Sequence, residues 1–333
     1  MKKVLYIEGD GVGPELVAHA RRVVNSIAKV EWVAGEAGYS TFQKKGTPLP
    51  KETIDSAKIC DAVLFCAVTT PPKIQNYKSA IVSLRKELDL YANLRPFASL
   101  PGVKLPFLSF PPVDFAIVRE NTEGMYSGIE EKKGDTATAT RVITKKGSER
   151  IARFAFEYAK RRGFSKVTIV HKANILRITD GLFLDCAREV ANDYQTIQCE
   201  DALVDSVAMR LVKSPEEFQV IVTTNLFGDI LSDESSALIG GLGVAPSGNY
   251  GKNHALFEPV HGSAPLLAGK NSANPTGMLL STAMLLDHIG EKKASERLAN
   301  AVRKCCEIGI TTKDVGGNAK TGEMVEKIVS LLG

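Results

Sequence analysis

The chain has 333 residues and a formal net charge of +4, from 42 Lys and Arg against 38 Asp and Glu. At roughly 150 residues per domain this length predicts about two domains, and a hydrophobic share of 44% excludes a disordered or collagen-like chain. The small charge, with no basic run longer than 160–162, argues against a nucleic-acid partner and favours small-molecule chemistry.

The sequence predicts neither secretion nor a membrane span. The apolar run near the N-terminus covers only residues 4–7, which is too short for the core of a signal peptide. No segment reaches the roughly 18 uncharged apolar residues that cross a bilayer. The six cysteines show no CxxC spacing and no disulfide-dense pattern. Buried thiols and a cytoplasmic location are therefore expected.

Strands and helices are expected to alternate along the first half of the chain. A short strand at 3–7 is followed by Pro14, which a first helical turn tolerates, so an amphipathic helix is expected to about residue 29. Residues 126–143 are rich in Gly, Thr and charges and are expected to form an extended arm. The other expected elements are a strand at 62–68, a helix at 79–88, strands at 91–95 and 115–119, and a helix at 147–162.

The alternation continues beyond residue 165 and ends in a loop that contains four glycines, at positions 240, 241, 243 and 248. Such an alternation predicts an α/β sheet protein. The expected elements are a strand at 166–171, a helix at 179–194, a strand at 196–200, a helix at 202–212, a strand at 219–224 and a helix at 226–239.

A glycine turn follows the first expected strand, with Gly9, Gly11 and Gly13 at alternate positions. It is similar to the phosphate-binding turn of a dinucleotide site, but Pro14 stands where the third fingerprint glycine belongs. Glu31 stands at the start of the next strand rather than at its end, where an acidic residue would bind a ribose. A tight turn that joins a strand to a helix is the favoured interpretation.

Asp229 and Asp233 are four residues apart in an expected helix, so both carboxylates leave one helix face. Two like charges at this spacing destabilise a helix by about 0.2–0.5 kcal/mol, which is tolerable on a solvated face and is compensated around a cation. The two aspartates alone fit either a solvated helix face or a metal site. If a metal is bound, oxygen ligands without His or Cys indicate Mg²⁺ or Mn²⁺ rather than zinc.

Three arginines stand near the ends of expected elements. Arg85 lies on a helix, and Arg95 and Arg119 end strands. Guanidinium groups bind carboxylates or phosphates through two parallel hydrogen bonds, so three converging arginines would indicate a substrate with two or three acidic groups. The alternative for each arginine is a surface position, paired with Glu87 or Glu120.

Lys172 directly follows the apolar strand expected at 166–171. A lysine at the edge of a sheet can be partly desolvated, which would suit it to act as a general base. The alternative is a solvated lysine at a strand end.

Taken together, these segments resemble the metal-dependent β-decarboxylating dehydrogenases, a family that includes isocitrate, homoisocitrate and 3-isopropylmalate dehydrogenases. The resemblance covers essentially the whole chain and is strongest to the homoisocitrate and isocitrate members. It rests on six motifs in order: EGDGVGPE at 8–15, DLYANLRP at 89–96, RENTEGMY at 119–126, HKAN at 171–174, TNLFGDILSD at 224–233 and EPVHGSAP at 258–265.

The resemblance implies an α/β fold of the isopropylmalate-dehydrogenase type, which is not a Rossmann fold. Two domains would share a mixed sheet, and a β-arm would lie at a dimer interface. Residues 1–92 and 240–333 would form a large, discontinuous cofactor-side domain. Residues 93–239 would form a small dimerisation and metal domain that includes the arm at 126–143.

The resemblance also implies the roles of individual residues. Lys172 would assist removal of the substrate's hydroxyl proton, and Tyr126 would protonate the enolate after CO₂ leaves. Lys172 and Asp205 would come from the partner subunit, which implies a homodimer with shared active sites, or a tetramer. The metal ligands for Mg²⁺ or Mn²⁺ would be Asp205, Asp229 and Asp233. The substrate-binding residues would be Ser79, Ile81, Val82, Arg85, Arg95, Arg119 and Asn174.

The cofactor would be a nicotinamide dinucleotide. Leu266 stands where many NAD-using members carry an Asp and NADP-using members a Lys, and Lys313 and Gly317 stand where NADP users carry a Tyr and an Arg. Neither charged set is complete, and NAD is favoured over NADP. The implied cofactor-binding residues are Thr70, Glu258, His261, Gly262, Ser263, Ala264, Leu266, Asn274 and Asp314.

The implied reaction is oxidative decarboxylation of a 3-substituted malate, a 2-hydroxy di- or tricarboxylate. Ser79 matches isocitrate enzymes, Ile81 matches isopropylmalate enzymes, and Val82 stands where some homoisocitrate enzymes carry an Arg. We therefore expect activity on homoisocitrate or isocitrate, with 3-isopropylmalate also oxidised. The alternatives are a dedicated 3-isopropylmalate dehydrogenase of leucine biosynthesis, a non-catalytic regulatory subunit, and a Rossmann-type 2-hydroxyacid dehydrogenase.

Overall fold

The computed structural model describes residues 1–71, 74, 77–105 and 111–333. The chain forms two compact units, and each combines segments that are distant in sequence. Unit 1 comprises Met1–Leu90, Ser99–Leu108 and Ile239–Gly333, and unit 2 comprises Tyr91–Ala98 and Ser109–Leu238. The assignment of cofactor binding to one domain and dimerisation to the other remains a prediction.

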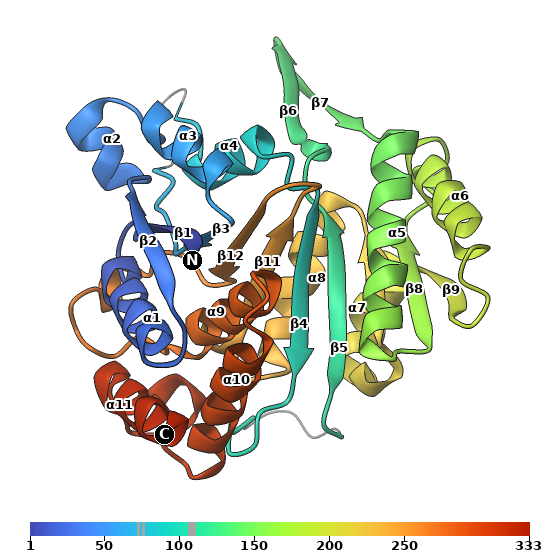
Figure 1. The fold of residues 1–333 in the computed structure, drawn as a ribbon. Coiled ribbons are helices and arrows are strands. Elements are labelled where there is room, and N and C mark those ends of the chain that lie inside the picture. The colour runs from blue at the N-terminus through green and yellow to red at the C-terminus, as the bar shows by residue number, and fades with distance from the viewer. Residues whose placement is uncertain (72–73, 75–76, 106–110) are drawn as a thin grey trace. The chain divides into compact units, whose positions relative to one another are not determined.

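Unit 1 contains five sheet strands in the order β2-β1-β3-β12-β11, and helices connect several of them along the chain (Figure 1). The strands pair in parallel except for β11 and β12, which are antiparallel. The elements are β1 (Lys2–Ile7), α1 (Gly13–Ile27), β2 (Val30–Gly35), α2 (Tyr39–Lys45), α3 (Lys51–Ile59), β3 (Ala62–Phe65), α4 (Ala80–Glu87), β11 (Pro246–Tyr250), β12 (Ala255–Pro259), α9 (Thr276–His288), α10 (Lys292–Glu307) and α11 (Thr321–Leu332).

The strands of unit 1 bury both of their faces because successive side chains point in opposite directions. Val4 and Leu64 join a core with α1, α9, α10 and α11. Leu5 and Val63, their neighbours in sequence, join a second core with α3 and α4. The helices therefore cover both faces of this part of the sheet, which leaves the strand ends and the loops to carry functional groups.

Unit 2 contains five sheet strands in the order β4-β5-β10-β8-β9, in which the β4–β5 pair is antiparallel and the others are parallel, and two further strands, β6 and β7, that pair separately. Long helix α5 packs beside α6, as Figure 1 shows. The elements are β4 (Ala92–Ala98), β5 (Asp114–Glu120), β6 (Gly124–Lys133), β7 (Thr136–Val142), α5 (Lys145–Arg162), β8 (Lys166–His171), α6 (Thr179–Ala191), β9 (Gln198–Leu203), α7 (Val204–Lys213), β10 (Val220–Thr223) and α8 (Asn225–Ala237).

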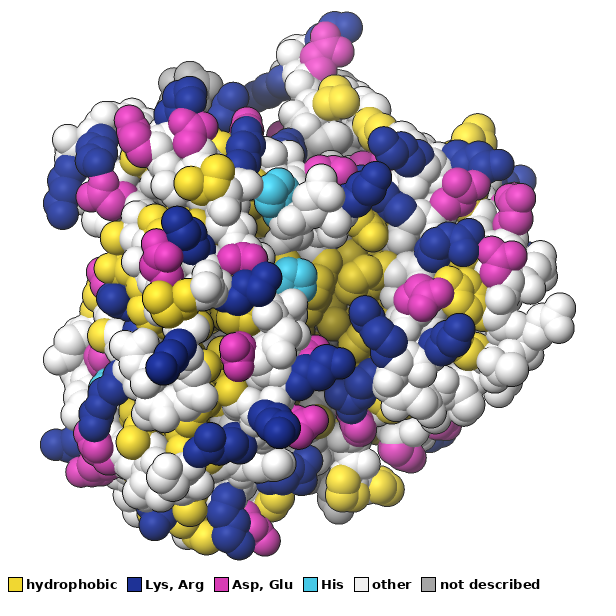
Figure 2. Space-filling model, viewed as in Figure 1, with side chains coloured by type: hydrophobic (Ala, Val, Ile, Leu, Met, Phe, Trp, Pro, Cys, Tyr) yellow, Lys and Arg dark blue, Asp and Glu magenta, His cyan; other side chains and the backbone are white. Residues whose placement is uncertain are grey.

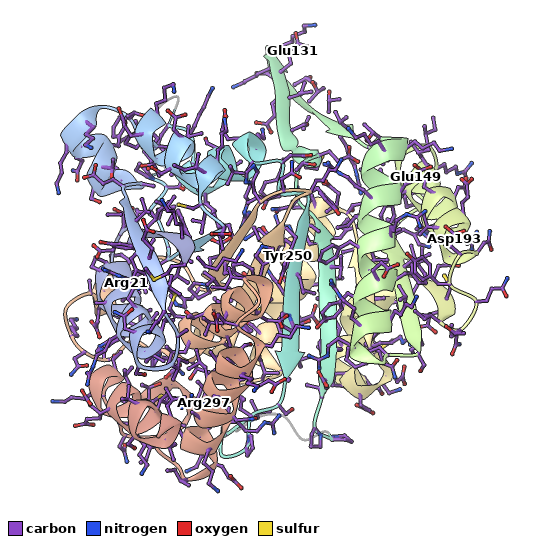
Figure 3. All side chains as sticks on the ribbon, viewed as in Figure 1. Arg21, Glu131, Glu149, Asp193, Tyr250 and Arg297 are labelled. Carbon is purple, nitrogen blue, oxygen red and sulfur yellow. The ribbon has the colours of Figure 1, made fainter. Side chains whose placement is uncertain are left out.

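Strands β6 and β7 form a separate antiparallel hairpin, which confirms the extended arm expected at 126–143. The hairpin turns at Gly134, whose φ of 58° is in the left-handed region. Residues 129–140 are all exposed, and Figure 3 shows Glu131 near the tip. A position of this arm at a dimer interface remains a prediction.

The glycine turn before α1 is a tight strand-to-helix turn, as favoured from the sequence. Gly9 and Gly11 have φ values of 72° and 63°, and α1 begins at Gly13. A Cβ on Gly11 would lie 1.8 Å from the carbonyl oxygen of Ser263. The glycine is required because the turn packs directly against the loop that contains Ser263.

Several expected element boundaries are wrong. The strand expected at 91–95 continues to Ala98, the helix expected at 179–194 ends at Ala191, and the strand expected at 196–200 is β9, which ends at Leu203. The strand expected at 62–68 ends at Phe65, and the helix expected from residue 202 begins at Val204 because β9 continues to Leu203. Leu203 pairs with His171 of β8, so the ladder between the two strands extends the sheet past the point where side-chain periodicity suggested a helix.

Charged residues on the surface are mixed. On the face that Figure 2 shows, Lys and Arg side chains are interspersed with Asp and Glu, as the small net charge predicts. Among the residues that the structure describes, every helix is too short or too polar to cross a bilayer.

Candidate active site

In unit 2, Arg95 on β4 and Arg119 on β5 lie buried beside α8. Arg119 is opposite Thr223 of β10, so its side chain emerges where β10 ends and α8 begins. The exposed fraction of the side chain is 7% for Arg95 and 2% for Arg119. Gly228 makes this approach possible, because a Cβ there would lie 2.6 Å from Cγ of Arg119.

Asp229 and Asp233 share one face of α8, as their spacing predicted, and the two arginines neutralise them. Arg119 forms a short ion pair with Oδ1 of Asp229. Arg95 lies 3.7 Å from Oδ1 of Asp229 and 3.4 Å from Oδ1 of Asp233. Desolvation raises the pKa of Asp233, and the charge of Asp229 adds to this effect while Arg95 opposes it. The result is a cluster of two carboxylates and two guanidinium groups.

Tyr126 on β6 joins the same cluster. Its hydroxyl donates a short hydrogen bond to Oδ2 of Asp229, and the guanidinium carbon of Arg119 lies 5.0 Å from its ring centre. Burial and the bond to Asp229 raise the pKa of Tyr126, against the opposing charge of Arg119. The phenol therefore keeps its proton at neutral pH, as a proton donor requires.

The structure overturns the alternative that the three arginines are surface residues. Arg85 also has a side chain only 12% exposed, and its Nη2 lies 2.7 Å from Oε1 of Glu258 on β12. Arg95 and Arg119 contact the carboxylates of α8 instead of Glu87 or Glu120. Arg95 and Arg119 are buried and Arg85 is partly buried, and each of the three lies beside a carboxylate.

Lys172 follows β8, and its ammonium lies 2.5 Å from Oδ1 of Asp205 on α7. This bond lowers the pKa of Asp205. The lysine side chain is 26% exposed and that of Asp205 is 63% exposed. Asn174 is exposed in the same turn. The chain thus presents Lys172 and Asp205 together at its surface.

The three predicted metal ligands do not converge within one chain. Asp229 and Asp233 lie together, while Asp205 pairs with Lys172. Over the described part of the chain, no group of three Asp, Glu, His or Cys side chains is close enough to hold a metal. The two carboxylates of α8 fit a magnesium or manganese ion chemically, because their oxygens are the ligands that such cations prefer.

In unit 1, α4 carries the predicted specificity residues and Arg85. Ser79 caps the start of α4 without a side-chain capping bond. Ile81 is half-buried and packs against the core beneath α4, and Val82 is also half-buried. Neither of these two side chains can neutralise a charge.

The 261–266 loop provides a candidate cofactor site in unit 1. The carbonyl oxygen of Ser263 accepts the Val12 N–H at 2.9 Å, and its hydroxyl lies 2.8 Å from that of Thr69. His261 has a buried Nε2 with no hydrogen-bond partner among the described residues, and burial lowers its pKa. An uncharged imidazole with a free ring nitrogen fits a dinucleotide ligand.

Asn274 and Asp314 are predicted cofactor residues outside this loop. Asn274 donates to Oδ2 of Asp314 at 3.1 Å, so these two side chains are held together. Leu266 is 81% exposed. Thr70 and Gly262 are exposed, and Ala264 has a left-handed φ of 39°.

The structure adds two residues that the sequence interpretation missed. Asn225 binds both Nε and Nη2 of Arg119 through Oδ1, at 3.0 and 2.7 Å. Ser232 accepts from Nη1 of Arg95 at 2.6 Å. Asn225 precedes Asp229 by one helical turn, and this spacing was the only signal for it in the sequence.

Comparisons with known proteins agree on one family. The family model described as isocitrate/isopropylmalate dehydrogenase matches residues 3–328. Homoisocitrate dehydrogenase of Methanocaldococcus jannaschii is 51% identical over 341 residues, with 100% of this chain and 98% of that protein covered. 3-Isopropylmalate dehydrogenase of Methanothermobacter thermautotrophicus is 48% identical over 327 residues, with 98% and 97% covered.

A solved structure agrees as well. The crystal structure of isocitrate dehydrogenase from Methylococcus capsulatus matches with a TM-score of 0.95 and 46% identity, over 100% of this chain and 99% of that one. These matches confirm the predicted fold and the resemblance to a metal-dependent, NAD(P)-using enzyme family that acts on small hydroxy acids. This chain therefore belongs to the isocitrate/isopropylmalate dehydrogenase family and is a decarboxylating dehydrogenase, an oxidoreductase.

Proposed function

We propose that this enzyme oxidises and decarboxylates homoisocitrate or isocitrate with NAD, and that it also accepts 3-isopropylmalate. The observation that carries the proposal is the cluster of Arg95, Arg119, Asp229, Asp233 and Tyr126. It combines two buried cations for substrate carboxylates, two oxygen donors for a divalent cation and a protonated phenol.

In this proposal each group of the cluster has one role. Arg95 and Arg119 bind and orient the substrate's carboxylates through paired N–H groups. Tyr126 gives its proton to the enolate carbon once CO₂ has left, and Lys172 from a second copy accepts the hydroxyl proton during oxidation. The metal, when bound by Asp229 and Asp233, supplies Lewis-acid stabilisation of negative charge on substrate oxygen.

The substrate preference rests on α4 and on the relatives. Ser79 offers a hydroxyl, and Ile81 and Val82 offer apolar contact without a charge. Such contacts separate substrates that differ by a methylene by about 1–3 kcal/mol, or roughly 10- to 200-fold. The 51% identical relative acts on homoisocitrate, which favours that substrate or isocitrate while leaving room for 3-isopropylmalate.

Two alternatives to this proposed function are considered. A dedicated 3-isopropylmalate dehydrogenase is supported by Ile81 and by the 48% identical relative. A non-catalytic regulatory subunit is disfavoured because such subunits lose metal or base residues, whereas Tyr126, Lys172 and both carboxylates of α8 are present.

NAD is the proposed cofactor. Leu266 is exposed at the position where NADP-using members carry a Lys. This position therefore has no cation that could bind the 2′-phosphate of NADP. In this proposal the nucleotide contacts His261, whose buried Nε2 has no hydrogen-bond partner among the described residues, and the Asn274–Asp314 pair.

The decisive experiment measures initial rates with isocitrate, homoisocitrate and 3-isopropylmalate, each with NAD and with NADP, in the presence of Mg²⁺ or Mn²⁺. We expect turnover of all three acids, higher with the tricarboxylic substrates, and higher with NAD. A preference for 3-isopropylmalate above about 10⁴-fold would support the dedicated enzyme and overturn the proposal, because the apolar contacts named above cannot supply such discrimination.

A further inference from the structure

Two side chains of unit 2 fix the backbone of the turn that carries Lys172. Asp180 is fully buried, at 0% exposed, and its Oδ2 accepts the Lys172 N–H at 2.6 Å. His171 accepts the next amide, that of Ala173, on Nδ1 at 3.0 Å, while its Nε2 lies 3.2 Å from Oδ2 of Asp201. Two successive amides of this turn are therefore held by side chains, and neither depends on the sheet ladder.

The other oxygen of Asp180 pairs with Arg141, a residue of β7. Nη2 of Arg141 lies 2.6 Å from Oδ1 of Asp180 and donates to Oγ1 of Thr224 at 2.8 Å. The guanidinium carbon lies 4.8 Å from the ring centre of Phe227 on α8. Desolvation lowers the pKa of Arg141, and the charge of Asp180 opposes that effect. The ion pair thus joins the Lys172 turn to the start of α8.

The stability of α6 does not require that Asp180 and Arg141 be buried. Asp180 stands in the first turn of α6, where an exposed carboxylate would already stabilise the helix terminus. Burying both charges costs desolvation energy that a surface pair avoids. The hydrogen bond to the Lys172 amide fixes Oδ2 of this carboxylate, while Oδ1 lies within ion-pair distance of Arg141 without a hydrogen bond.

We propose that Asp180, oriented by Arg141, is a positioning residue for Lys172. It fixes the turn from which the lysine ammonium reaches Asp205. The proposal rests on the function proposed above, in which Lys172 accepts the hydroxyl proton. A displacement of about 1 Å in such a group can cost roughly 100-fold in rate, so an anchored backbone is expected to matter for turnover.

Two double variants isolate the hydrogen bond from the ion pair. Both carry Arg141→Met, so neither leaves an unpaired buried guanidinium. In one, Asp180→Asn keeps an acceptor for the Lys172 N–H; in the other, Asp180→Leu has nearly the same shape without an acceptor. The control pairs Arg153→Met on α5 with Asp193→Asn just after the end of α6, where Figure 3 labels Asp193; it removes an exposed ion pair of 3.1 Å.

We expect the Leu variant to have a kcat about 10- to 100-fold below that of the Asn variant. KM for the hydroxy acid should change less than threefold, because Arg95 and Arg119 are untouched. The control should match the parent. Melting temperatures are measured on all variants, and Asp180→Ala replaces Asp180→Leu if the latter does not fold.

The same two variants in a Lys172→Met background test whether Asp180 acts through the lysine. We expect the difference in kcat between Asn and Leu to disappear there. An equal loss in both backgrounds, or no loss in either, would overturn the positioning role. If Lys172→Met alone keeps parental turnover, the proposed role of Lys172 in the reaction fails instead, so the two failures are distinguishable.

Discussion

Gly228→Ala is a direct test of how closely α8 must approach Arg119. In a helix interior, Ala is more stable than Gly by about 1 kcal/mol where space permits. At position 228 the new Cβ would lie 2.6 Å from Cγ and 2.7 Å from Cβ of Arg119. These atoms are next to the backbone of a buried strand, so the side chain cannot swing away as a flexible end could.

The substitution should therefore reverse the usual sign. Overpacking of a filled site costs about 1–3 kcal/mol or more, which exceeds the helix gain. We expect a net loss of stability of about 1–2 kcal/mol. Because Arg119 pairs with Asp229, the displacement should also lower kcat/KM by roughly 10- to 100-fold.

Gly181→Ala provides a matched control. Gly181 lies in α6, and a Cβ there would meet nothing within 4 Å. This variant should be more stable than the parent by about 0.5–1 kcal/mol and fully active. Urea unfolding and initial rates of all three proteins give the comparison. If Gly228→Ala is as stable and as active as Gly181→Ala, the inferred contact between α8 and Arg119 is wrong.

Four further predictions concern the reaction. Asp229→Asn, or EDTA treatment of the parent, should abolish turnover, and full activity after either would contradict metal dependence. Mixed dimers of the nearly inactive variants Lys172→Met and Tyr126→Phe, which keep only a residual rate, should regain one intact site after subunit exchange, whereas sites built within one chain would give no recovery. Val82→Arg should shift kcat/KM from 3-isopropylmalate toward the tricarboxylic acids, because an added guanidinium pairs with their extra carboxylate. Leu266→Asp should lower KM for NAD and raise KM for NADP. Equal effects on the two KM values would show that residue 266 does not discriminate between the two nucleotides.

Features set by local rules could be predicted from the sequence. The helical spacing of Asp229 and Asp233 placed both on one face, and Pro14 and the glycines marked a turn into a helix. Hydrophobicity alone does not tell which of two neighbouring apolar residues, Ile230 or Leu231, is buried. Successive helical residues point about 100° apart, and Ile230 is 59% exposed while Leu231 is buried.

Contacts between distant segments could not be predicted from periodicity. Arg95 and Ser232 are 137 positions apart, and Arg119 and Asn225 are 106 apart. Such pairs depend on which strands neighbour one another and on where each strand ends. The sequence indicated that these segments converge only through the six ordered motifs, because they resemble those of the β-decarboxylating dehydrogenases. The role of Asp180 had no signal at all, since a single Asp in a helical first turn is common.

The single chain itself argues for a second copy. A Mg²⁺ ion takes about six oxygen ligands, and α8 offers two carboxylates that already bind Arg95 and Arg119. Asp205 pairs with Lys172 at 2.5 Å, and its side chain is 63% exposed. An ion pair between a partly exposed lysine and an exposed carboxylate contributes little to stability. We propose that they complete the carboxylate cluster of a neighbouring copy, so that each half is incomplete until two chains associate.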